Sequence, residues 1–283
     1  MRPSKRLGQH FLVSRDYLRR IVAAAEIAPS DVVLEVGPGL GILTVALARL
    51  AGRVVAVEID PRMRAVLADV VAAQDNVQIV AADVLAVDPA ELAGVAGGDA
   101  GDEVGRRRGY LLVANLPYYI TSAVLRHVLE APVKPERAVV TIQREVADRI
   151  LAEPGDWSVL TAAVRFFAAP SLVTGVPAEA FHPPPKVESA VLRLDVRPGP
   201  PVKVPSEAAF FRVVKAGFRL RRKQLKNSLA AGLGCDRAAA RRLLVSAGVD
   251  PERRPQTLDL EEWAAVATEW ALHAPAEREA AEE

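Results

Sequence analysis

The chain has very little cysteine and no cluster of histidines. Its 283 residues include one cysteine, Cys235, which excludes an internal disulfide and a metal cluster held by cysteines. The four histidines are scattered along the chain without the spacing of metal ligands. We therefore expect no metal site, so the chemistry has to come from other residue types.

Long apolar runs are also missing, and the sequence predicts no membrane-spanning helix. The first twelve residues, MRPSKRLGQHFL, are basic but contain no apolar core of a signal peptide. Hydrophobic residues make up 51% of the chain and charged residues 25%, which is typical of a soluble globular protein. We expect a cytoplasmic protein with one large and one small domain.

The charge of the chain is small but unevenly distributed. The net charge is +1, yet residues 203–254 hold 13 Lys and Arg against four Asp and Glu. This segment therefore carries +9 and the remainder of the chain carries −8. The asymmetry predicts a basic face near the C-terminus that binds a polyanion.

Apolar, β-branched runs alternate with helical patterns over the first two thirds of the chain. This alternation predicts an α/β fold with a parallel sheet and helices on both faces. Strands are expected at 32–36, 54–57, 77–81, 110–114 and 138–142, with weaker candidates at 166–168 and 191–194. Helices are expected at 40–50, 62–72, 122–129 and 144–151.

The second part of the chain has a different pattern. A Gly-rich surface loop is expected at 94–109, and the Pro-rich stretch 197–205 reads as a linker. The sequence therefore predicts a catalytic domain at 1–197 and a helical basic domain at 198–283. In the latter, helices are expected at 206–218, 222–231 and 236–246, followed by one that starts with an Asp259–Glu262 capping box.

A glycine-rich turn follows the first expected strand. Residues 35–41 read EVGPGLG, with G-x-G-x-G spacing in place of the G-x-G-x-x-G of dinucleotide-binding turns. Gly37 and Gly39 allow a tight turn and close approach of the backbone to a ligand. An acid before the first glycine is typical of sites for S-adenosylmethionine. An ordinary turn between strand and helix is the alternative that this motif leaves open.

Two further acids stand at the ends of the next two expected strands. Glu58 ends one, where a carboxylate can accept hydrogen bonds from both ribose hydroxyls. Asp83 ends the other, where a carboxylate can accept from an adenine amino group. Each alone could be a solvated acid. Because the carboxyl ends of parallel strands share one edge of a sheet, the three motifs together favour a nucleoside cofactor.

The fourth expected strand ends in Asn115-Leu116-Pro117-Tyr118. Pro117 cannot continue the strand, so it fixes a bend at the same edge of the sheet. The Asn115 amide oxygen and a backbone carbonyl can accept both hydrogens of an exocyclic amine, while the tyrosine ring stacks on the base. This pattern predicts methyl transfer to an amine by positioning and electrostatic support, with no strong general base.

In these motifs the sequence resembles the ribosomal RNA adenine N6,N6-dimethyltransferases, and specifically their small-subunit branch. The resemblance covers nearly the whole chain. It rests on GQHFL (8–12), EVGPGLG (35–41), VEID (57–60), the Asp83 turn, NLPY (115–118), QREVADR (143–149), FHPPPKVESAV (181–191) and FRLRRKQLKNSL (218–229).

The resemblance implies a Rossmann-like class I S-adenosylmethionine-dependent methyltransferase sheet with a smaller all-helical C-terminal domain. The implied reaction dimethylates N6 of two adjacent adenines near the 3′ end of 16S rRNA during late small-subunit assembly. S-adenosyl-L-homocysteine would be the other product. Members of this branch affect sensitivity to kasugamycin, so loss of activity should raise resistance to it.

The resemblance also implies roles for single residues. The cofactor would be held by Gln9, His10, Leu12, Gly37, Gly39, Glu58, Asp83, Val84 and Asn115. The target adenine, unpaired or flipped out, would meet Asn115, Leu116, Pro117, Tyr118 and Phe181. The RNA backbone would be bound by Arg219, Arg221, Arg222, Lys223 and Lys226. The implied partner is the small ribosomal subunit with its rRNA, and we assume a monomer.

Two features depart from the family pattern: His10 stands where the family often has Asn, and the loop at 94–109 is longer than expected. Three alternative functions stay open. The first is a large-subunit (23S) rRNA adenine methylase of the erythromycin-resistance type, which methylation of purified subunits would separate. The second is an RNA-binding assembly or transcription factor with secondary methylation. The third is a dinucleotide-dependent dehydrogenase, which the glycine spacing disfavours.

Overall fold

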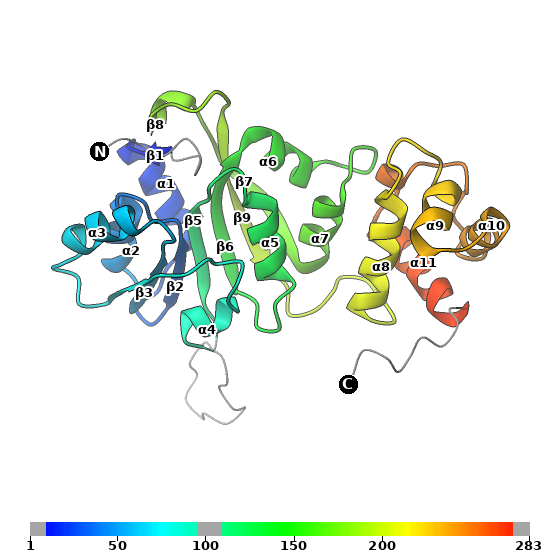
Figure 1. Ribbon diagram of the computed structural model, residues 1–283, viewed down its shortest axis with the longest axis horizontal. Coiled ribbons are helices and arrows are strands. Elements are labelled where there is room, and N and C mark those ends of the chain that lie inside the picture. Colours follow the sequence, from blue (N-terminus) through cyan, green and yellow to red (C-terminus); the bar gives the residue numbers. More distant parts are fainter. Residues whose placement is uncertain (1–9, 96–108, 274–283) are drawn as a thin grey trace. The chain divides into compact units, whose positions relative to one another are not determined.

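The computed structural model describes residues 10–95 and 109–273, which pack into two compact units (Figure 1). The first unit extends to Leu151 and also contains Ala168–Arg197. The second contains Ala152–Phe167 and the residues from Pro198 onward. A boundary at residue 197 was predicted from the Pro-rich linker. Residues 152–167, which the predicted division places in the first domain, belong to the second unit, where they pack with the C-terminal helices.

A seven-stranded sheet lies at the centre of the first unit, in the order β4-β3-β2-β5-β6-β9-β7. The first five strands of this order are parallel, as expected, whereas β9 runs antiparallel to both of its neighbours. The strands are β2 (Val32–Val36), β3 (Arg53–Val57), β4 (Val77–Val80), β5 (Leu111–Asn115), β6 (Arg137–Gln143), β7 (Ala168–Val176) and β9 (Ser189–Val196).

The apolar runs of the central strands are buried without interruption. Val54, Val55 and Ala56 of β3 are each fully buried, as are Leu112 and Val113 of β5. Because successive strand residues point to opposite faces, such a run means that both faces of the sheet are covered. The α/β class predicted from the sequence is confirmed.

Helices follow the parallel strands along the chain. Those of the first unit are α1 (Arg15–Ala25), α2 (Ile42–Ala48), α3 (Pro61–Val70), α4 (Pro89–Ala93), α5 (Thr121–Leu129) and α6 (Arg144–Leu151), together with the short 3₁₀ helix η2 (Ala178–Ala180). Within residues 10–95 and 109–273, no helix combines the length and the apolar character needed to cross a bilayer. The predicted loop at 94–109 falls largely on residues 96–108, outside the described part.

One predicted strand was wrong. Residues 166–168 were expected to form a strand, but Phe166 and Phe167 end helix α7 (Val159–Phe167), and β7 begins only at Ala168. Strand β7 lies at an edge of the sheet. An edge position tolerates Pro170, whose missing N–H would break a central ladder. The candidate at 191–194 lies inside β9 and is confirmed.

A two-stranded antiparallel sheet was not predicted. It pairs β1 (Phe11–Leu12) with β8 (Phe181–His182), so that Leu12 lies opposite Phe181 and Phe11 opposite His182. The pairing joins residues that are 169 and 171 positions apart in sequence. It holds the start of the described chain close to the segment that precedes β9.

The second unit is helical, as the sequence predicts. Its helices are α7, α8 (Glu207–Phe218), α9 (Leu225–Leu233), α10 (Arg237–Ser246) and α11 (Leu260–His273), with the 3₁₀ turn η3 (Pro255–Thr257). The predicted caps are present. The Ser206 hydroxyl accepts from the Ala209 N–H at 3.0 Å, and Asp259 and Glu262 bond each other's backbone N–H at 3.1 and 2.9 Å.

Candidate nucleoside and methyl-transfer site

The order of the strands places two of the predicted motifs side by side. From β2 the chain continues outward to β3 and β4, and from β5 it continues to β6 on the other side. The connections after β2 and β5 therefore diverge, which leaves a crevice at the carboxyl edge between them. The glycine turn and the NLPY segment meet there. A Cβ added to Gly37 would lie 3.4 Å from the Pro117 ring.

A pocket opens at this edge, and its wall contains most of the predicted site residues. Eleven of them line it, namely His10, Leu12, Gly37, Gly39, Glu58, Asp83, Val84, Asn115, Leu116, Pro117 and Tyr118. Gln9 lies outside the described residues. Phe181 does not line the pocket. The fold thus brings together the predicted pocket residues that the structure describes, with Phe181 as the exception.

The glycine turn forms a tight cradle on one side of the pocket. The Gly37 N–H donates to the Val57 carbonyl at 3.0 Å, which extends the pairing of β2 and β3 into the turn. Gly39 has a φ of 55°, and a Cβ there would lie 2.8 Å from the Phe11 ring. A larger residue at Gly39 would therefore be strained and would clash with β1.

Glu58 is buried and held by the backbone around it. One carboxylate oxygen accepts from the Gly39 N–H at 3.4 Å, and the other accepts from the Asp60 N–H at 2.9 Å. Burial raises the pKa of the Glu58 carboxyl, and these backbone bonds act against that rise. The side chain is fixed in the pocket wall, where its remaining lone pairs can accept from hydroxyl groups of a ligand.

Glu35, the acid that precedes the first glycine of the turn, was part of the predicted motif but was not assigned a contact of its own. Its side chain lines the pocket and is 1% exposed, and its Oε2 atom has no hydrogen-bond partner among the described residues. Burial raises the pKa of the Glu35 carboxyl to about 8, and the nearby charge of Glu58 adds to this effect. Its place two residues before Gly37 was the available signal. A buried carboxyl group with one oxygen left unpartnered suits a cationic group of a ligand.

Asp83 lies at the open rim of the pocket. Its side chain is exposed, and Oδ1 accepts from the Leu85 N–H at 3.0 Å, which fixes the turn after β4. The next residue, Val84, is buried at 4% exposure. The pair offers a polar acceptor beside an apolar surface, which is the combination that a purine ring needs.

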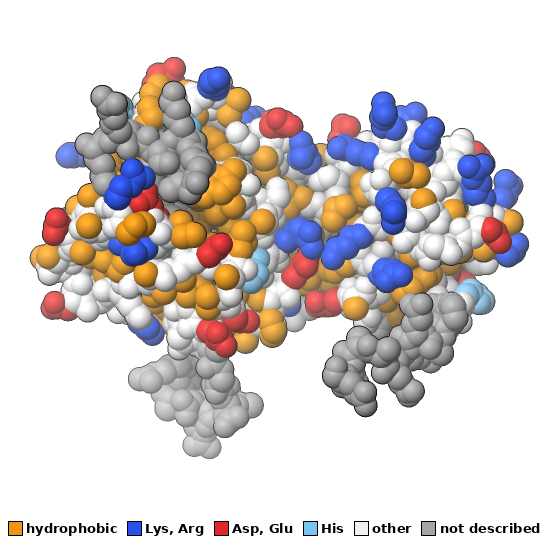
Figure 2. Space-filling model, viewed as in Figure 1, with side chains coloured by type: hydrophobic (Ala, Val, Ile, Leu, Met, Phe, Trp, Pro, Cys, Tyr) orange, Lys and Arg blue, Asp and Glu red, His pale blue; other side chains and the backbone are white. Residues whose placement is uncertain are grey.

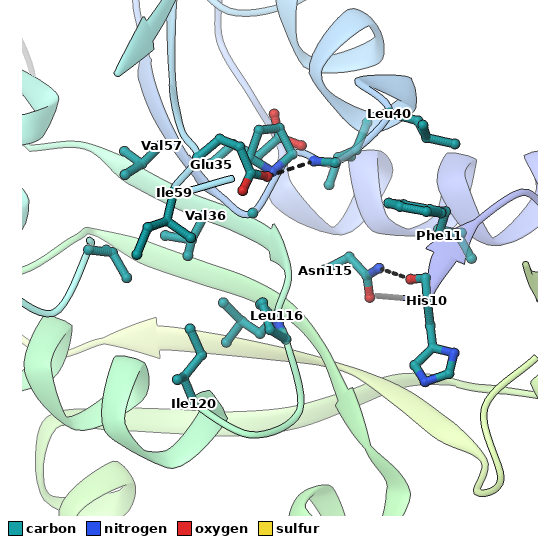
Figure 3. Close-up of a pocket in the computed structure, with 18 of the residues that line it drawn as sticks. His10, Phe11, Glu35, Val36, Leu40, Val57, Ile59, Asn115, Leu116 and Ile120 are labelled. Carbon is teal, nitrogen blue, oxygen red and sulfur yellow. Dashed lines mark hydrogen bonds between the residues drawn. The ribbon is translucent and has the colours of Figure 1, made fainter. Parts of the chain in front are cut away.

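Asn115 ends β5 on the opposite side of the pocket from Val57 and Ile59 (Figure 3). Its Nδ2 donates to the His10 carbonyl at 3.1 Å, which fixes the orientation of the amide. Its Oδ1 is buried and has no partner among the described residues. An unpartnered buried acceptor is unfavourable unless a ligand donates to it. Oδ1 is therefore prepared to receive an N–H group.

Tyr118 is held at both ends of its side chain. Its hydroxyl bonds the Ser189 hydroxyl at 2.6 Å, and its ring stacks on the His10 ring with centroids 5.6 Å apart and planes inclined by 23°. Burial raises the pKa of the Tyr118 phenol, so the group stays neutral. The ring is thus a rigid, uncharged surface in the pocket wall.

Phe181 takes a different place from the one expected. It is 3% exposed, pairs with Leu12 in the small sheet, and packs in the hydrophobic core with Leu12 and Ala180. The expectation that Phe181 closes the face of the target base opposite Tyr118 does not match this position. Its side chain helps to hold β1 against β8 in the core.

The predicted RNA-binding residues all lie in the second unit, where Figure 2 shows many Lys and Arg side chains at the surface. Helix α9 starts at Leu225, later than expected, so the segment before it is a turn between α8 and α9. Four of the predicted residues are exposed in this turn, namely Arg219, Arg221, Arg222 and Lys223. Lys226 differs from them. It is partly buried, and its ammonium forms an ion pair with Glu252.

The residues of the pocket fit S-adenosylmethionine. The cofactor of the reaction carries a ribose, an adenine amino group and an amino-acid ammonium, and the pocket offers Glu58, Asp83 and Glu35 as acceptors for them. Because Gly37 and Gly39 line the pocket and carry no side chain, the backbone of the turn can approach a ligand closely. Within the described part of the chain, no group of three His, Cys, Asp or Glu residues is arranged to bind a metal ion.

Comparison with known proteins agrees with these features. The chain matches the family described as Ribosomal RNA adenine dimethylase over residues 2–267. Ribosomal RNA small subunit methyltransferase A of Dehalococcoides mccartyi is 47% identical over 93% of this chain and 87% of its own length. The protein of that name from Pelotomaculum thermopropionicum is 46% identical over 94% and 90%.

Two solved structures are similar over nearly the whole chain. The 23S rRNA methyltransferase ErmE is 30% identical with a TM-score of 0.66, over 92% of this chain and 98% of its own. A dimethyladenosine transferase from Plasmodium falciparum shares the fold with a TM-score of 0.70 at 24% identity, over 93% and 98%. With the motifs gathered in one pocket and these matches over its length, the chain belongs to the ribosomal RNA adenine dimethylase family.

Proposed function

We propose that this chain, an S-adenosylmethionine-dependent rRNA adenine dimethyltransferase, methylates N6 of two adjacent adenines near the 3′ end of 16S rRNA. The observation that carries the proposal is the Asn115 Oδ1 atom, a buried acceptor without a partner beside a nucleoside pocket. The matches to small subunit methyltransferase A, at 47% and 46% identity, support the small-subunit substrate over the large-subunit alternative.

The cofactor would be held along the carboxyl edge of β2, β3 and β4. Glu58 would accept from the ribose hydroxyls and Asp83 from the adenine amino group, and Val84 would pack on the ring. Gly37 and Gly39 would let the backbone approach, while Glu35 would pair with the amino-acid ammonium. Leu12 and the backbone of His10 would contribute the N-terminal part of the pocket wall, and Gln9, which lies outside the described residues, is proposed for cofactor binding from the resemblance alone. When bound, the cofactor supplies an electrophilic methyl group on a sulfonium.

The transfer step is carried by the end of β5. Asn115 Oδ1 accepts one hydrogen of the target amine and the Leu116 carbonyl accepts the other. The lone pair of the amine is thereby directed at the methyl carbon. The target nitrogen would take the methyl group that the bound cofactor supplies, the carbon–sulfur bond would break as the nitrogen–carbon bond forms, and the nitrogen would release its proton to water. Both oxygens stabilise the positive charge that develops on nitrogen.

The target base is held by the bend that follows β5. Pro117 fixes the backbone at Leu116, whose side chain is 1% exposed and whose N–H donates to the Thr141 carbonyl at 3.1 Å. Tyr118 provides the stacking surface, and its bond to Ser189 fixes the position of the hydroxyl end of the ring. An adenine in a duplex cannot reach this surface, so the base enters unpaired or flipped out.

The basic turn of the second unit binds the RNA backbone. Arg219, Arg221, Arg222 and Lys223 are exposed, which leaves their charges available to phosphates. Such contacts position the substrate and carry little sequence information. We propose a monomeric enzyme of the cytoplasm that acts on the small subunit during late assembly without a metal, so that loss of activity raises kasugamycin resistance. S-adenosyl-L-homocysteine is the product.

The test is methyl transfer from labelled S-adenosylmethionine to unmethylated small ribosomal subunits, with unmethylated large subunits in parallel. The proposal predicts label as N6,N6-dimethyladenosine in the small-subunit RNA alone. Label in the large subunit alone would assign the chain to the large-subunit methylases. No label in either, with intact cofactor binding, would favour an RNA-binding assembly factor.

A further inference from the structure

We propose that the His10 side chain is a positioning residue for the target adenine, acting through Tyr118. This inference rests on the proposed function. It separates the role of the His10 ring from cofactor binding, to which the sequence pattern had assigned the residue.

Three contacts of His10 reach the parts of the site that handle the base. Its carbonyl accepts from Asn115 Nδ2 at 3.1 Å, its ring stacks on Tyr118 at 5.6 Å, and its Nδ1 bonds the Pro183 carbonyl at 2.8 Å. None of these contacts is to the residues at the ends of β2, β3 and β4. Figure 3 places His10 beside Asn115, on the opposite side of the pocket from Val57 and Ile59.

The contacts divide between the backbone and the side chain of His10. The backbone carbonyl orients the Asn115 amide so that Oδ1 is left for the amine, and any residue at position 10 provides this bond. The contact with the Tyr118 ring, by contrast, is made by the imidazole. Tyr118 has two faces, and a ring packed on one of them leaves the other for a base.

The imidazole is itself fixed in place. Nδ1 donates to the Pro183 carbonyl in the segment between β8 and β9, and Ser189, which anchors the Tyr118 hydroxyl, begins β9. The two anchors therefore come from one short segment. Together they hold His10 and Tyr118 as a pair of stacked rings with a constant spacing. Such a pair presents a stiffer surface to the base than Tyr118 alone.

The inference is tested by steady-state methylation of unmethylated small subunits, with kcat and the KM for subunits measured separately. His10→Ala removes the ring and should lower kcat/KM for subunits by about 3- to 10-fold, the range expected for one aromatic contact. His10→Phe keeps a ring without Nδ1 and should recover most of this loss. Protection against thermal unfolding by S-adenosylmethionine should be unchanged in both variants.

His182→Ala is the matched control. His182 lies in the same two-stranded sheet, opposite Phe11, but it is exposed and does not line the pocket. Its kinetics should equal those of the wild type. Equal losses in His10→Ala and His10→Phe would overturn the inference, because a ring at position 10 would then have no effect.

Two further outcomes also count against it. Tighter binding of subunits by His10→Ala would mean that the imidazole occupies the place of the base. Loss of thermal protection by S-adenosylmethionine would return His10 to the cofactor. If the wild type methylates neither subunit, the proposed function fails as well, which distinguishes that failure from one confined to the His10 variants.

Discussion

The pocket of the first unit and the basic turn of the second use polar residues in opposite ways. In the pocket, Glu35 and Glu58 are at most 7% exposed, and Asn115 Oδ1 is buried without a partner. In the turn between α8 and α9, the charged side chains are exposed. Buried polar groups have strong, geometry-dependent interactions, whereas exposed charges act weakly and over longer distances. The pocket is therefore expected to control the rate, and the turn the affinity for RNA.

The largest effect is expected from Asn115→Ala. This change removes the acceptor for the target amine, and loss of one such group typically lowers kcat by about 100- to 1,000-fold. Binding of small subunits should be retained, since the basic turn is untouched. Asn115→Asp keeps an acceptor at Oδ1 and should retain more activity than Ala. Wild-type methylation by Asn115→Ala, measured with labelled cofactor, would contradict the assigned role.

A second effect concerns stability in the absence of cofactor. The pKa of the Glu35 carboxyl is raised to about 8 by burial, above its unfolded value near 4.5. The folded state therefore binds more protons than the unfolded state, and this contribution to stability is lost as the pH rises from about 4.5 to 8. Glu35→Gln should raise the free energy of unfolding at pH 8, on the order of 2–4 kcal/mol.

At pH 5 the difference between Glu35→Gln and the wild type should nearly disappear. Urea unfolding at both pH values measures it. Glu179→Gln, which changes an exposed acid in η2, is the control and should show little difference at either pH. A pH-independent effect of Glu35→Gln would mean that the carboxyl is ionised in the folded protein.

A smaller effect is expected in the basic turn. The double change Arg221→Ala and Arg222→Ala should raise the KM for small subunits by about tenfold and leave kcat unchanged. It should also reduce the slope of the logarithm of the binding constant against the logarithm of the salt concentration by about two. Lys226→Ala should have less effect, because this ammonium is already paired with Glu252. An equal effect of Lys226→Ala would show that the internal pair opens on RNA.

The smallest effect concerns the fold of the second unit alone. The Ser206 hydroxyl caps α8 by accepting from the Ala209 N–H. Ser206→Ala removes this cap and should lower the free energy of unfolding by about 1 kcal/mol. Ser246→Ala, at the exposed end of α10, is the matched control and should be nearly neutral. Methylation at a temperature where both variants are folded should be unaffected. A loss of activity there would link the start of α8 to the reaction.

The same contrast explains which elements could be predicted from the sequence. Strands β2, β3, β5 and β6 were predicted because they are mostly buried, which gives them apolar runs. Strand β4 is only partly buried, and its Val77, Ile79 and Val80 were the signal that predicted it. The strand that corresponds to β7 was predicted at the wrong residues, 166–168. Strand β7 lies at an edge of the sheet, where Pro170 and polar residues are allowed, so its sequence does not resemble a buried strand. Helix α7 was missed because most of its residues are buried, Phe166 and Phe167 among them, which hides the helical period.

In the site, the ends of the parallel strands could be predicted because each is marked by a local motif. The contacts between distant segments could not. Asn115 and His10 are 105 residues apart and have no pattern in common, so their hydrogen bond follows only from the folded chain. Phe181 was assigned to the pocket by resemblance, but the pairing of β1 with β8 buries it in the core.

The division of roles between pocket and turn is tested most directly by single-turnover methylation of small subunits at subsaturating enzyme. Rates are compared for Asn115→Ala, for the Arg221→Ala and Arg222→Ala variant, and for all three changes combined. If the pocket acts on the chemical step and the turn on RNA binding, the two effects multiply in the combined variant. A combined loss that equals the Asn115→Ala loss alone would contradict independent roles.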